Sequence, residues 1–349
     1  MRVYDNFNPQ IHTSSSMAAD IADHVELIEG DVRDSGTLHN ALHGCEALLH
    51  LAAETGTGQS MYEVSRYEQV NMGGTANLMD YLVNNSSSKV CKLVVASSRA
   101  LYGEGKYLCP SHNVVYPAFR SAEEMDKGHF EPTCPACGSQ CSPLPTDESS
   151  PIQPSSFYGI TKQMQEQMTL LFGASLKLSA FALRYQNVYG PGQSLVNPYT
   201  GILAIFAGQA RKGEPIEIFE DGRESRDFVY IQDVVEATWR CLQTKTSGLA
   251  AINVGSGQRT SVLEVARAIV EFFGSQSEVN VTGAYRLGDI RHNYAELTLA
   301  NRLLDYSPRV KFSEGIQAFL VWAEQQNQQT AEGYRQSLDA LRQRGLMRG

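Results

Sequence analysis

Residues 92–98 (KLVVASS) form an almost continuous apolar run that ends in two serines, and residues 47–53 (ALLHLAA) form a similar run upstream. Such runs are typical of strands that are buried on both faces of a parallel sheet. Between them, residues 67–85 place apolar side chains at helical spacing. Two shorter candidate strands, at 1–5 and 24–29, precede these elements. The alternation of strands and helices predicts an α/β fold with a doubly wound parallel sheet and right-handed crossovers.

The composition indicates a globular protein of about two domains. The chain has 349 residues, of which 42% are hydrophobic and 19% are charged, so it can bury a core. Its net charge of −9 argues against nucleic acid or a membrane surface as partner, because both require a basic face. No apolar stretch is long enough to span a membrane, no signal peptide is evident, and seven cysteines are too few for a disulfide scaffold. We therefore expect a cytoplasmic protein.

The start of the chain departs from the layout of a dinucleotide-binding sheet. In such sheets a glycine-rich turn follows the first strand, and an acid about 20 residues later binds the adenosine ribose. Asp5 matches that acid, but no glycine-rich turn precedes it. The glycine pairs at 56–58, 190–192 and 255–257 each lack the third glycine of the fingerprint. We therefore expect that the chain lacks the first strand, glycine turn and first helix, and that Met1 is an internal start.

Five motifs occur along the chain in a fixed order: SSRALYG at 97–103, YGITK at 158–162, LRYQNVYGPG at 183–192, RDFVYIQD at 226–233 and RLGDIRH at 286–292. Together they resemble the extended short-chain dehydrogenase/reductase family of sugar-nucleotide epimerases and dehydratases. The resemblance covers nearly the whole chain. It implies a Rossmann-like NAD-binding domain and a smaller C-terminal domain that binds the nucleotide-sugar substrate.

The resemblance also suggests domain boundaries. We expect residues 1–190 to form the NAD-binding domain, with an insert at 104–145. Residues 191–325 would mainly form the substrate-binding domain, while 225–256 return to the NAD-binding sheet. The tail at 326–349 is rich in Gln and Arg and has only weak helical spacing of its leucines, so we expect a solvated or frayed helix there.

The pair Tyr158 and Lys162 carries the predicted chemistry. Four positions apart on a predicted helix, the two side chains project from one face. A nearby ammonium stabilises phenolate, so we expect Lys162 to lower the pKa of Tyr158 and to make it a general base toward a sugar hydroxyl. The resemblance further implies that Lys162 holds the nicotinamide ribose and that Ser98 hydrogen-bonds the reacting oxygen.

The residues after Ser98 favour one reaction over others. Family members that remove water or carbon dioxide from the sugar carry acidic residues there, whereas this chain has Arg99 and Ala100. A guanidinium cannot remove a carbon-bound proton at neutral pH. We therefore expect an NAD-dependent 4-epimerase that oxidises C4, reduces it on the other face and recycles its NAD. A dehydratase or reductase remains an alternative, as does a non-catalytic protein that lacks the backbone cradle for the NAD pyrophosphate.

The remaining binding residues are implied by the resemblance. The cofactor-binding set is Asp5, Asn6, Asp31, Val32, Leu51, Ala52, Ala53, Asn71 and Ser97, together with Tyr158 and Lys162. The substrate-binding set is Asn187, Arg226, Arg286 and Asp289. Two arginines suit a pyrophosphate because the guanidinium fork is planar and always charged. Relatives commonly pair through a face of two helices, so the resemblance also implies a homodimer.

The insert carries a metal-binding pattern. Cys109 and His112 form a C-x2-H pair, and after 21 intervening residues Cys134 and Cys137 form a C-x2-C pair. This spacing suits a zinc ribbon with one tetrahedral structural Zn²⁺, although free cysteines are the alternative. Cys141 is a spare thiol, or a substitute ligand if His112 is not used.

The position of this insert adds a further resemblance. Cysteine-bearing inserts directly after the catalytic serine strand resemble a bacterial branch of the family that includes dTDP-L-rhamnose 4-epimerases. Such a ribbon can bind nucleic acid, but no basic cluster surrounds it, which argues against that partner. Because the insert directly follows the Ser98 strand, we expect it to shape the substrate entrance or a subunit contact. Cys45, Cys91 and Cys241 lie in apolar or strand-like settings, and we expect them to be small core residues.

Overall fold

The computed structural model describes residues 1–12, 19–199, 201–245, 247–326 and 331–349. Its centre is a parallel sheet of four strands in the order β13-β8-β4-β3, which confirms the predicted parallel sheet. These strands are β3 (Ala47–His50), β4 (Lys92–Ser98), β8 (Ser179–Tyr185) and β13 (Leu249–Val254).

Helices cover both faces of this sheet. Leu93 packs with residues of α2 and α5, whereas its neighbour Val94 packs with residues of α9 and α11. This alternation explains why β4 is apolar along nearly its whole length. The covering helices are α2 (Ser35–Leu42), α5 (Gly74–Asn84) and α7 (Phe157–Leu176) on one face, and α9 (Ile231–Gln243) and α11 (Thr298–Leu304) on the other.

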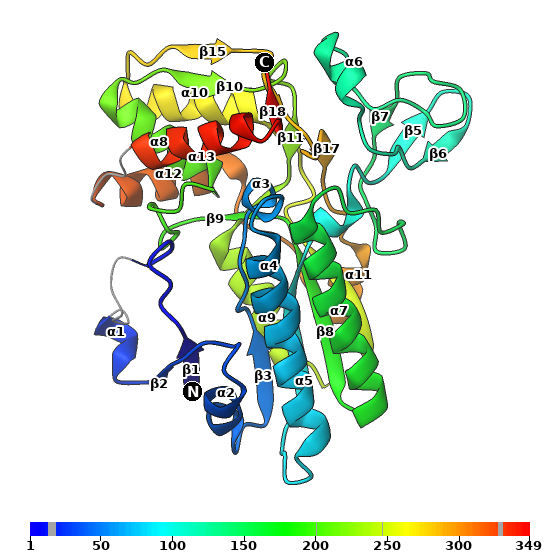
Figure 1. The fold of residues 1–349 in the computed structure, drawn as a ribbon, viewed down its shortest axis with the longest axis vertical. Helices are drawn as coiled ribbons and strands as arrows, with labels where there is room; N and C mark the ends of the chain where they lie inside the picture. The colour runs from blue at the N-terminus through cyan, green and yellow to red at the C-terminus, as the bar shows by residue number, and fades with distance from the viewer. Residues whose placement is uncertain (13–18, 200, 246, 327–330) are drawn as a thin grey trace.

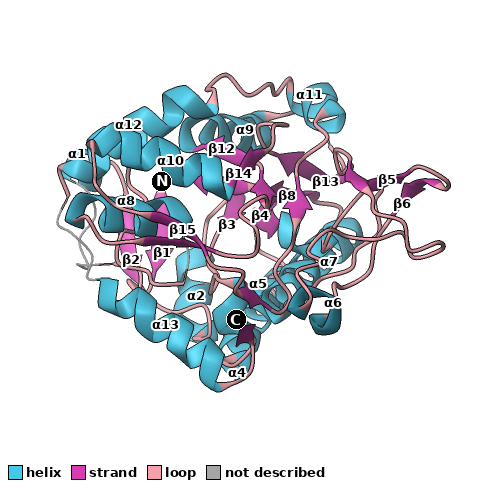
Figure 2. Cartoon of the chain, turned by 90° about the horizontal axis from the view of Figure 1, so that it is seen from above, coloured by secondary structure: helices cyan, strands magenta, loops and turns pink. Residues whose placement is uncertain are grey.

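The N-terminal strands form a separate small sheet. β1 (Arg2–Asp5) pairs in parallel with β2 (Glu26–Glu29), and Figures 1 and 2 both show β1 between β2 and β3. Among the described residues, no backbone hydrogen-bond ladder joins β1 to β3. Within the described residues, the sheet is therefore interrupted between β1 and β3.

Several short helical segments lie between the strands of the N-terminal half. The predicted helix at 67–85 is helical throughout residues 64–84 but contains a π-helical turn, Glu68–Gly73, between α4 (Val64–Tyr67) and α5. The other short helices are α1 (Ala19–Ala22), α3 (Thr57–Ser60) and the 3-10 turn η2 (Arg99–Tyr102) that follows β4.

The insert projects from the body of the molecule as a small antiparallel unit (Figure 1). Its strands pair in the order β6-β5-β7. Its elements are β5 (Tyr107–Cys109), β6 (Asn113–Val115), α6 (Ala122–Asp126) and β7 (Ser142–Pro143).

The C-terminal part has its own apolar core, formed where three helices pack around a pair of parallel strands. These are α8 (Ile202–Lys212), α10 (Val262–Phe273), α12 (Phe312–Glu324), β10 (Ile216–Ile218) and β15 (Val279–Val281). Small pairings link this core to the sheet. They involve β9 (Asn187–Tyr189), β11 (Ser225–Arg226), β12 (Phe228–Tyr230), β14 (Thr260–Ser261) and β17 (His292–Asn293).

The expectation of a solvated tail is wrong. Residues 327–330 lie outside the described residues, but α13 (Ala331–Gln343) packs onto the body through Leu338 and Leu341, which are 4% and 5% exposed. β18 (Met347–Arg348) then pairs with β16 (Tyr285–Arg286). The spacing of the leucines correctly indicated a helix. Because most residues around them are polar, the sequence did not indicate that Leu338 and Leu341 are buried.

The cysteines outside the insert divide into three environments. Cys241 is buried in the core, as expected, and Cys45 is half-buried. The prediction that Cys91 lies in the core is wrong. Cys91 is exposed because it precedes β4, at the end of the sheet.

None of the described helices is long and apolar enough to cross a lipid bilayer.

Candidate active site

A cavity of about 520 Å³ lies where β4 and β8 end, against the C-terminal core. Ligands of open α/β sheets bind at the carboxyl ends of the strands. The predicted residues in its wall are Leu51, Ser97, Ser98, Tyr158, Lys162, Asn187, Arg226, Arg286 and Asp289. Wall residues that sequence reasoning did not assign to binding or catalysis include Arg99, Tyr199, Glu224, Tyr334 and Leu341.

The start of α7 brings Tyr158 next to Ser98. Ser156 caps the helix by accepting a hydrogen bond from the Gly159 N–H at 3.2 Å. A Cβ on Gly159 would lie 2.7 Å from the carbonyl oxygen of Ala100, so only glycine allows this approach. The Ala100 N–H donates to Ser98 Oγ at 3.1 Å and orients the serine.

Lys162 lies one helical turn below the tyrosine. Its Nζ is 5.9 Å from the centre of the Tyr158 ring and donates a 2.8 Å hydrogen bond to the carbonyl oxygen of Ala96. Burial lowers the pKa of Lys162 to about 7. The spacing of the two residues therefore gives the predicted shared face, with the Lys162 side chain buried.

The expected effect of Lys162 on the tyrosine is wrong. Burial raises the pKa of Tyr158 above its usual value, and the groups that oppose this shift are Ser98 and the positive charge of Arg99. The cation that opposes this rise in the pKa is thus Arg99, which follows Ser98 in the sequence.

Arg99 is the most informative residue that sequence reasoning left without a binding role. Its Nε donates a 2.7 Å hydrogen bond to Oδ1 of Asn187, while its buried Nη1 has no partner among the described residues. Burial and the like charge of Arg226 lower the pKa of Arg99 to about 9. The signal was present in the sequence, because Arg99 directly follows the predicted catalytic serine.

The substrate loop, which we define as residues 286–292, carries two of the predicted binding residues. Arg286 forms an ion pair with Asp289, with Nε and Nη2 at 2.9 and 2.8 Å from Oδ2. Gly288 has φ +84°, and a Cβ there would lie 2.5 Å from the carbonyl oxygen of Ser155. The glycine of this motif is therefore required by the tight approach of the loop to the start of α7.

Asn71 and Ser97 have structural partners. Asn71 is fully buried in the π-helical turn, donates to Glu54 O and Thr161 Oγ1 at 3.0 and 2.9 Å, and does not line the cavity. Ser97 Oγ donates to Glu166 at 2.7 Å. The Asn71 side chain thus joins the loop after β3 to α7, beneath the site.

The predicted adenosine-binding residues gather away from the cavity, after β1 and β2. Asp31 pairs with the guanidinium of Arg33 at 2.7–2.8 Å and accepts a 2.9 Å hydrogen bond from Asn6. Although burial opposes it, the hydrogen bond from Arg33 holds the pKa of Asp31 well below its usual value. Asp5 accepts from the Phe7 N–H at 2.8 Å. Val32 is buried, and Ala52 and Ala53 are half-buried after β3.

The four predicted metal ligands come together in the insert. The ligand atoms of Cys109, His112, Cys134 and Cys137 all lie within 4.8 Å of one another. His112 Nδ1 is 3.7 Å from the sulfur of Cys109 and 3.6 Å from that of Cys134. Cys141 is buried nearby but is not part of this group.

Comparison with known proteins agrees with this geometry. Residues 10–121 and 119–255 match the NAD dependent epimerase/dehydratase family. The chain therefore belongs to this family. A dTDP-L-rhamnose 4-epimerase of Burkholderia thailandensis is 38% identical over 326 residues, which cover 93% of this chain and 88% of that protein.

Solved structures share the same fold. A UDP-glucose 4-epimerase of Thermotoga maritima, determined with UDP-glucose, has a TM-score of 0.73 at 26% identity and covers 93% of this chain and 90% of its own. MoeE5 in complex with UDP-glucuronic acid and NAD has a TM-score of 0.70 at 28% identity, with 86% of each chain covered.

Proposed function

We propose that this chain is an NAD-dependent nucleotide-sugar 4-epimerase and that its substrate is dTDP-L-rhamnose or a related dTDP- or UDP-hexose. The observation that carries the proposal is the single cavity that holds Ser98, Tyr158 and Lys162 together with Asn187, Arg226 and Arg286. The 38% identity to a dTDP-L-rhamnose 4-epimerase supports the choice of sugar.

In this proposal Tyr158 is the general base. As phenolate it takes the proton of the sugar 4-hydroxyl, and as phenol it returns the proton after the 4-keto sugar has turned over. Ser98 hydrogen-bonds the reacting oxygen. Arg226 and Arg286 bind the pyrophosphate, because a fixed guanidinium fork matches phosphate oxygens.

The nicotinamide end of NAD fits the residues around Lys162. The ammonium of Lys162 has three hydrogen-bond donors. Among the described residues, one donor is bound to the carbonyl oxygen of Ala96, and no carboxylate forms an ion pair with the ammonium. The free donors suit ribose hydroxyls. NAD⁺ held there would supply the hydride acceptor for oxidation at C4 and the hydride donor for reduction on the opposite face. At the adenosine end the candidates are Asp5, Asn6, Asp31 and Val32.

The side chain of Arg99 argues against dehydration. With a pKa of about 9 it stays charged at neutral pH, so it cannot act as the base that removes a carbon-bound proton. Its position in the cavity wall beside Asn187 suits an anion or a sugar hydroxyl instead.

The proposal is tested by product analysis. Purified protein is first assayed for bound NAD after acid release, and it is then incubated with dTDP-L-rhamnose and a panel of UDP-hexoses. We expect an isomeric product of unchanged mass. Tyr158→Phe should lower kcat by about 10²–10⁴-fold, whereas Tyr116→Phe, outside the cavity, should not. A product lighter by one water would indicate a dehydratase, and folded protein without NAD and without turnover would indicate the non-catalytic alternative.

A homodimer is part of the proposal. Helices α5 and α7 lie side by side (Figure 1) and expose the apolar side chains of Val83, Ile160 and Leu171. Exposed apolar groups on adjacent helices support pairing with a second copy. Light scattering should give twice the monomer mass, and Leu171→Glu should give the monomer.

The four-residue cluster of the insert would add a structural Zn²⁺ that takes no part in the reaction.

A further inference from the structure

The ligand cluster of the insert has the dimensions of a tetrahedral zinc site. With Zn–S of about 2.3 Å and Zn–N of about 2.0–2.1 Å, a tetrahedron has edges of about 3.8 Å between sulfurs and about 3.6 Å between sulfur and nitrogen. The Cys109 and Cys137 sulfurs are 3.7 Å apart, and His112 Nδ1 lies 3.6–3.7 Å from two of the sulfurs. These distances are far longer than the roughly 2.05 Å of a disulfide.

The cluster joins two turns that little else holds together. Cys109 and His112 flank the turn between β5 and β6, and Cys134 and Cys137 form a second turn that closes at Gly138 with φ +72°. The apolar core beneath them consists of few side chains, three of which are themselves cysteines. Such a small core contributes little stability, and metal binding commonly supplies what is missing.

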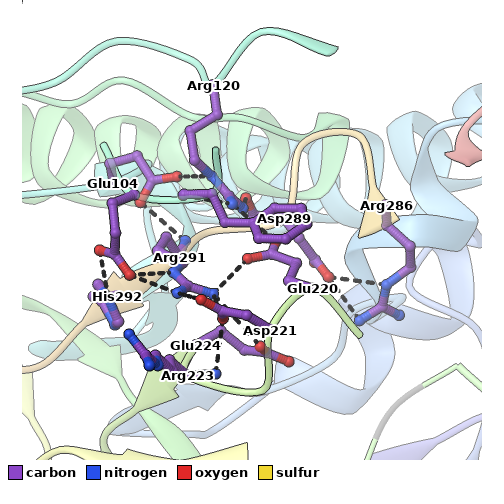
Figure 3. Close-up of polar contacts among 12 residues, drawn as sticks. Glu104, Arg120, Glu220, Asp221, Arg223, Glu224, Arg286, Asp289, Arg291 and His292 are labelled. Carbon is purple, nitrogen blue, oxygen red and sulfur yellow. Dashed lines mark hydrogen bonds and ion pairs between the residues drawn. The ribbon is translucent and has the colours of Figure 1, made fainter. Parts of the chain in front are cut away.

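The second turn is tied directly to the substrate loop. Glu131, three residues before Cys134, accepts a 3.0 Å hydrogen bond from Arg291 Nε and lies 3.1 Å from His292 Nε2. Arg291 is completely buried, and it also pairs with Glu220 at 2.8 Å (Figure 3). The insert thus supplies part of the negative charge that a buried guanidinium requires.

Arg120 makes a second link between the insert and the substrate loop. Its side chain is only 6% exposed and pairs with Glu104 at 2.9 Å and Glu220 at 2.8 Å. Its Nη2 donates a 2.7 Å hydrogen bond to the backbone carbonyl of Asp289 (Figure 3). The insert therefore holds the loop at both its middle and its end.

Both cavity arginines depend on this loop. Arg286 is oriented by the carboxylate of Asp289, and Arg226 Nη1 donates a 3.1 Å hydrogen bond to the carbonyl oxygen of Arg291. A shift of the loop would move both guanidinium groups away from the positions that face the cavity.

We infer that a zinc ion bound by Cys109, His112, Cys134 and Cys137 fixes the insert, and that the insert, through Arg120 and Glu131, positions the substrate loop for binding the nucleotide sugar. Arg120 and Glu131 are positioning residues that act through Asp289 and Arg291. The kinetic part of this inference rests on the proposed function, whereas the metal part does not.

The metal is tested first, by elemental analysis of the full chain after purification without chelators. We expect one Zn²⁺ per chain in the wild type and in Cys91→Ser, and none in Cys137→Ser. Cys91 and Cys137 are both exposed, so the pair of variants is matched. Replacement by Co²⁺ should produce the absorption of a tetrahedral thiolate complex. Wild-type protein without zinc, or a Cys137→Ser variant that retains it, would overturn the metal site.

The link to the substrate loop is tested with Glu131→Gln, which leaves all four ligands in place. We expect this variant to keep its zinc but to raise KM for the nucleotide sugar, and Kd for dTDP, by about tenfold, with kcat within about threefold of wild type. Chelation of zinc from the wild type should have the same effect, which covers the case in which Cys137→Ser does not fold. Unchanged KM and Kd in both experiments would overturn the link. If no epimerase activity is found, the Kd for dTDP still tests the link between the insert and the substrate loop. Failure of the proposed function is therefore distinguished from failure of this inference.

Discussion

Arg99 Nε donates a 2.7 Å hydrogen bond to Oδ1 of Asn187, which joins the residue after Ser98 to the start of β9. The bond holds a guanidinium in the cavity wall with one nitrogen unpartnered among the described residues. An unpaired buried donor is costly unless a ligand satisfies it. In the proposed mechanism this pair would link Ser98 to the residues that bind the substrate.

Arg99→Gln should slow the reaction at neutral pH. The positive charge of Arg99 lowers the pKa of Tyr158, so its removal raises that pKa and leaves less phenolate. The acidic limb of the kcat/KM profile should move to higher pH by about one unit, a rate loss of about tenfold at a fixed pH below it. Arg223→Gln, at an exposed position, is the control. A profile that does not move would contradict the assigned electrostatic role.

Glu166→Gln should destabilise the whole protein. Glu166 and Arg184 form an ion pair whose side chains are 4% and 5% exposed, with Nε of Arg184 3.0 Å from the carboxylate. Removal of one charge leaves the other buried and unpaired, at a cost of about 3–5 kcal/mol in urea unfolding. Glu236→Gln breaks a more exposed pair with Arg240 and should cost less than about 1 kcal/mol. Equal effects of the two substitutions would be inconsistent with this interpretation.

His50 should make stability depend on pH. Burial, and then the charge of Lys162, lower its pKa to about 4 in the folded chain, against 6.5 in the unfolded chain. Between these values the unfolded chain binds more protons, so stability falls as pH falls from about 6.5 to about 4, by about 3 kcal/mol in total. His50→Gln should remove this part of the pH dependence, and the exposed His24→Gln should not. The measurement is the free energy of unfolding at pH 7 and pH 5.

Leu341→Ala should weaken substrate binding more than it slows turnover. Leu341 is 5% exposed, lines the cavity and lies 3.3 Å from the position that a Cβ on Gly58 would occupy. Its truncation removes packing worth about 2–5 kcal/mol, which loosens α13 over the site. We expect a raised KM and faster hydrogen exchange in α13. Val321→Ala, at a half-exposed position on α12, should change neither.

The sequence predicted the elements whose pattern is local. The apolar run of β4, the spacing of Tyr158 and Lys162, and the two ligand pairs of the insert each depend on neighbouring residues, and the structure has them where the patterns indicate. The environment of Tyr158 could not be obtained in this way. Its pKa depends on how deeply the site is buried and on a cation from a different element.

The contribution of α13 could not be predicted for a related reason. Most of its residues are polar, and only contact with Phe219 and Ala284 shows that Leu338 and Leu341 are buried. The place of Asn71 also depends on the fold, because its side chain donates to Glu54 and Thr161 from distant parts of the chain. Its contact with the cofactor, which the resemblance implies, stays a prediction.

The placement of Tyr334 and Leu341 in the cavity wall also determines when the site forms during synthesis. Ser98 and Tyr158 leave the ribosome long before α13 and before β18, which pairs with the start of the substrate loop. A nascent chain can thus bring Ser98 and Tyr158 together while one side of the cavity is still open. Only chains that extend through Leu341 contain every residue of the cavity wall, so translation arrest or proteolysis before α13 would leave Ser98 and Tyr158 in place but the cavity unclosed.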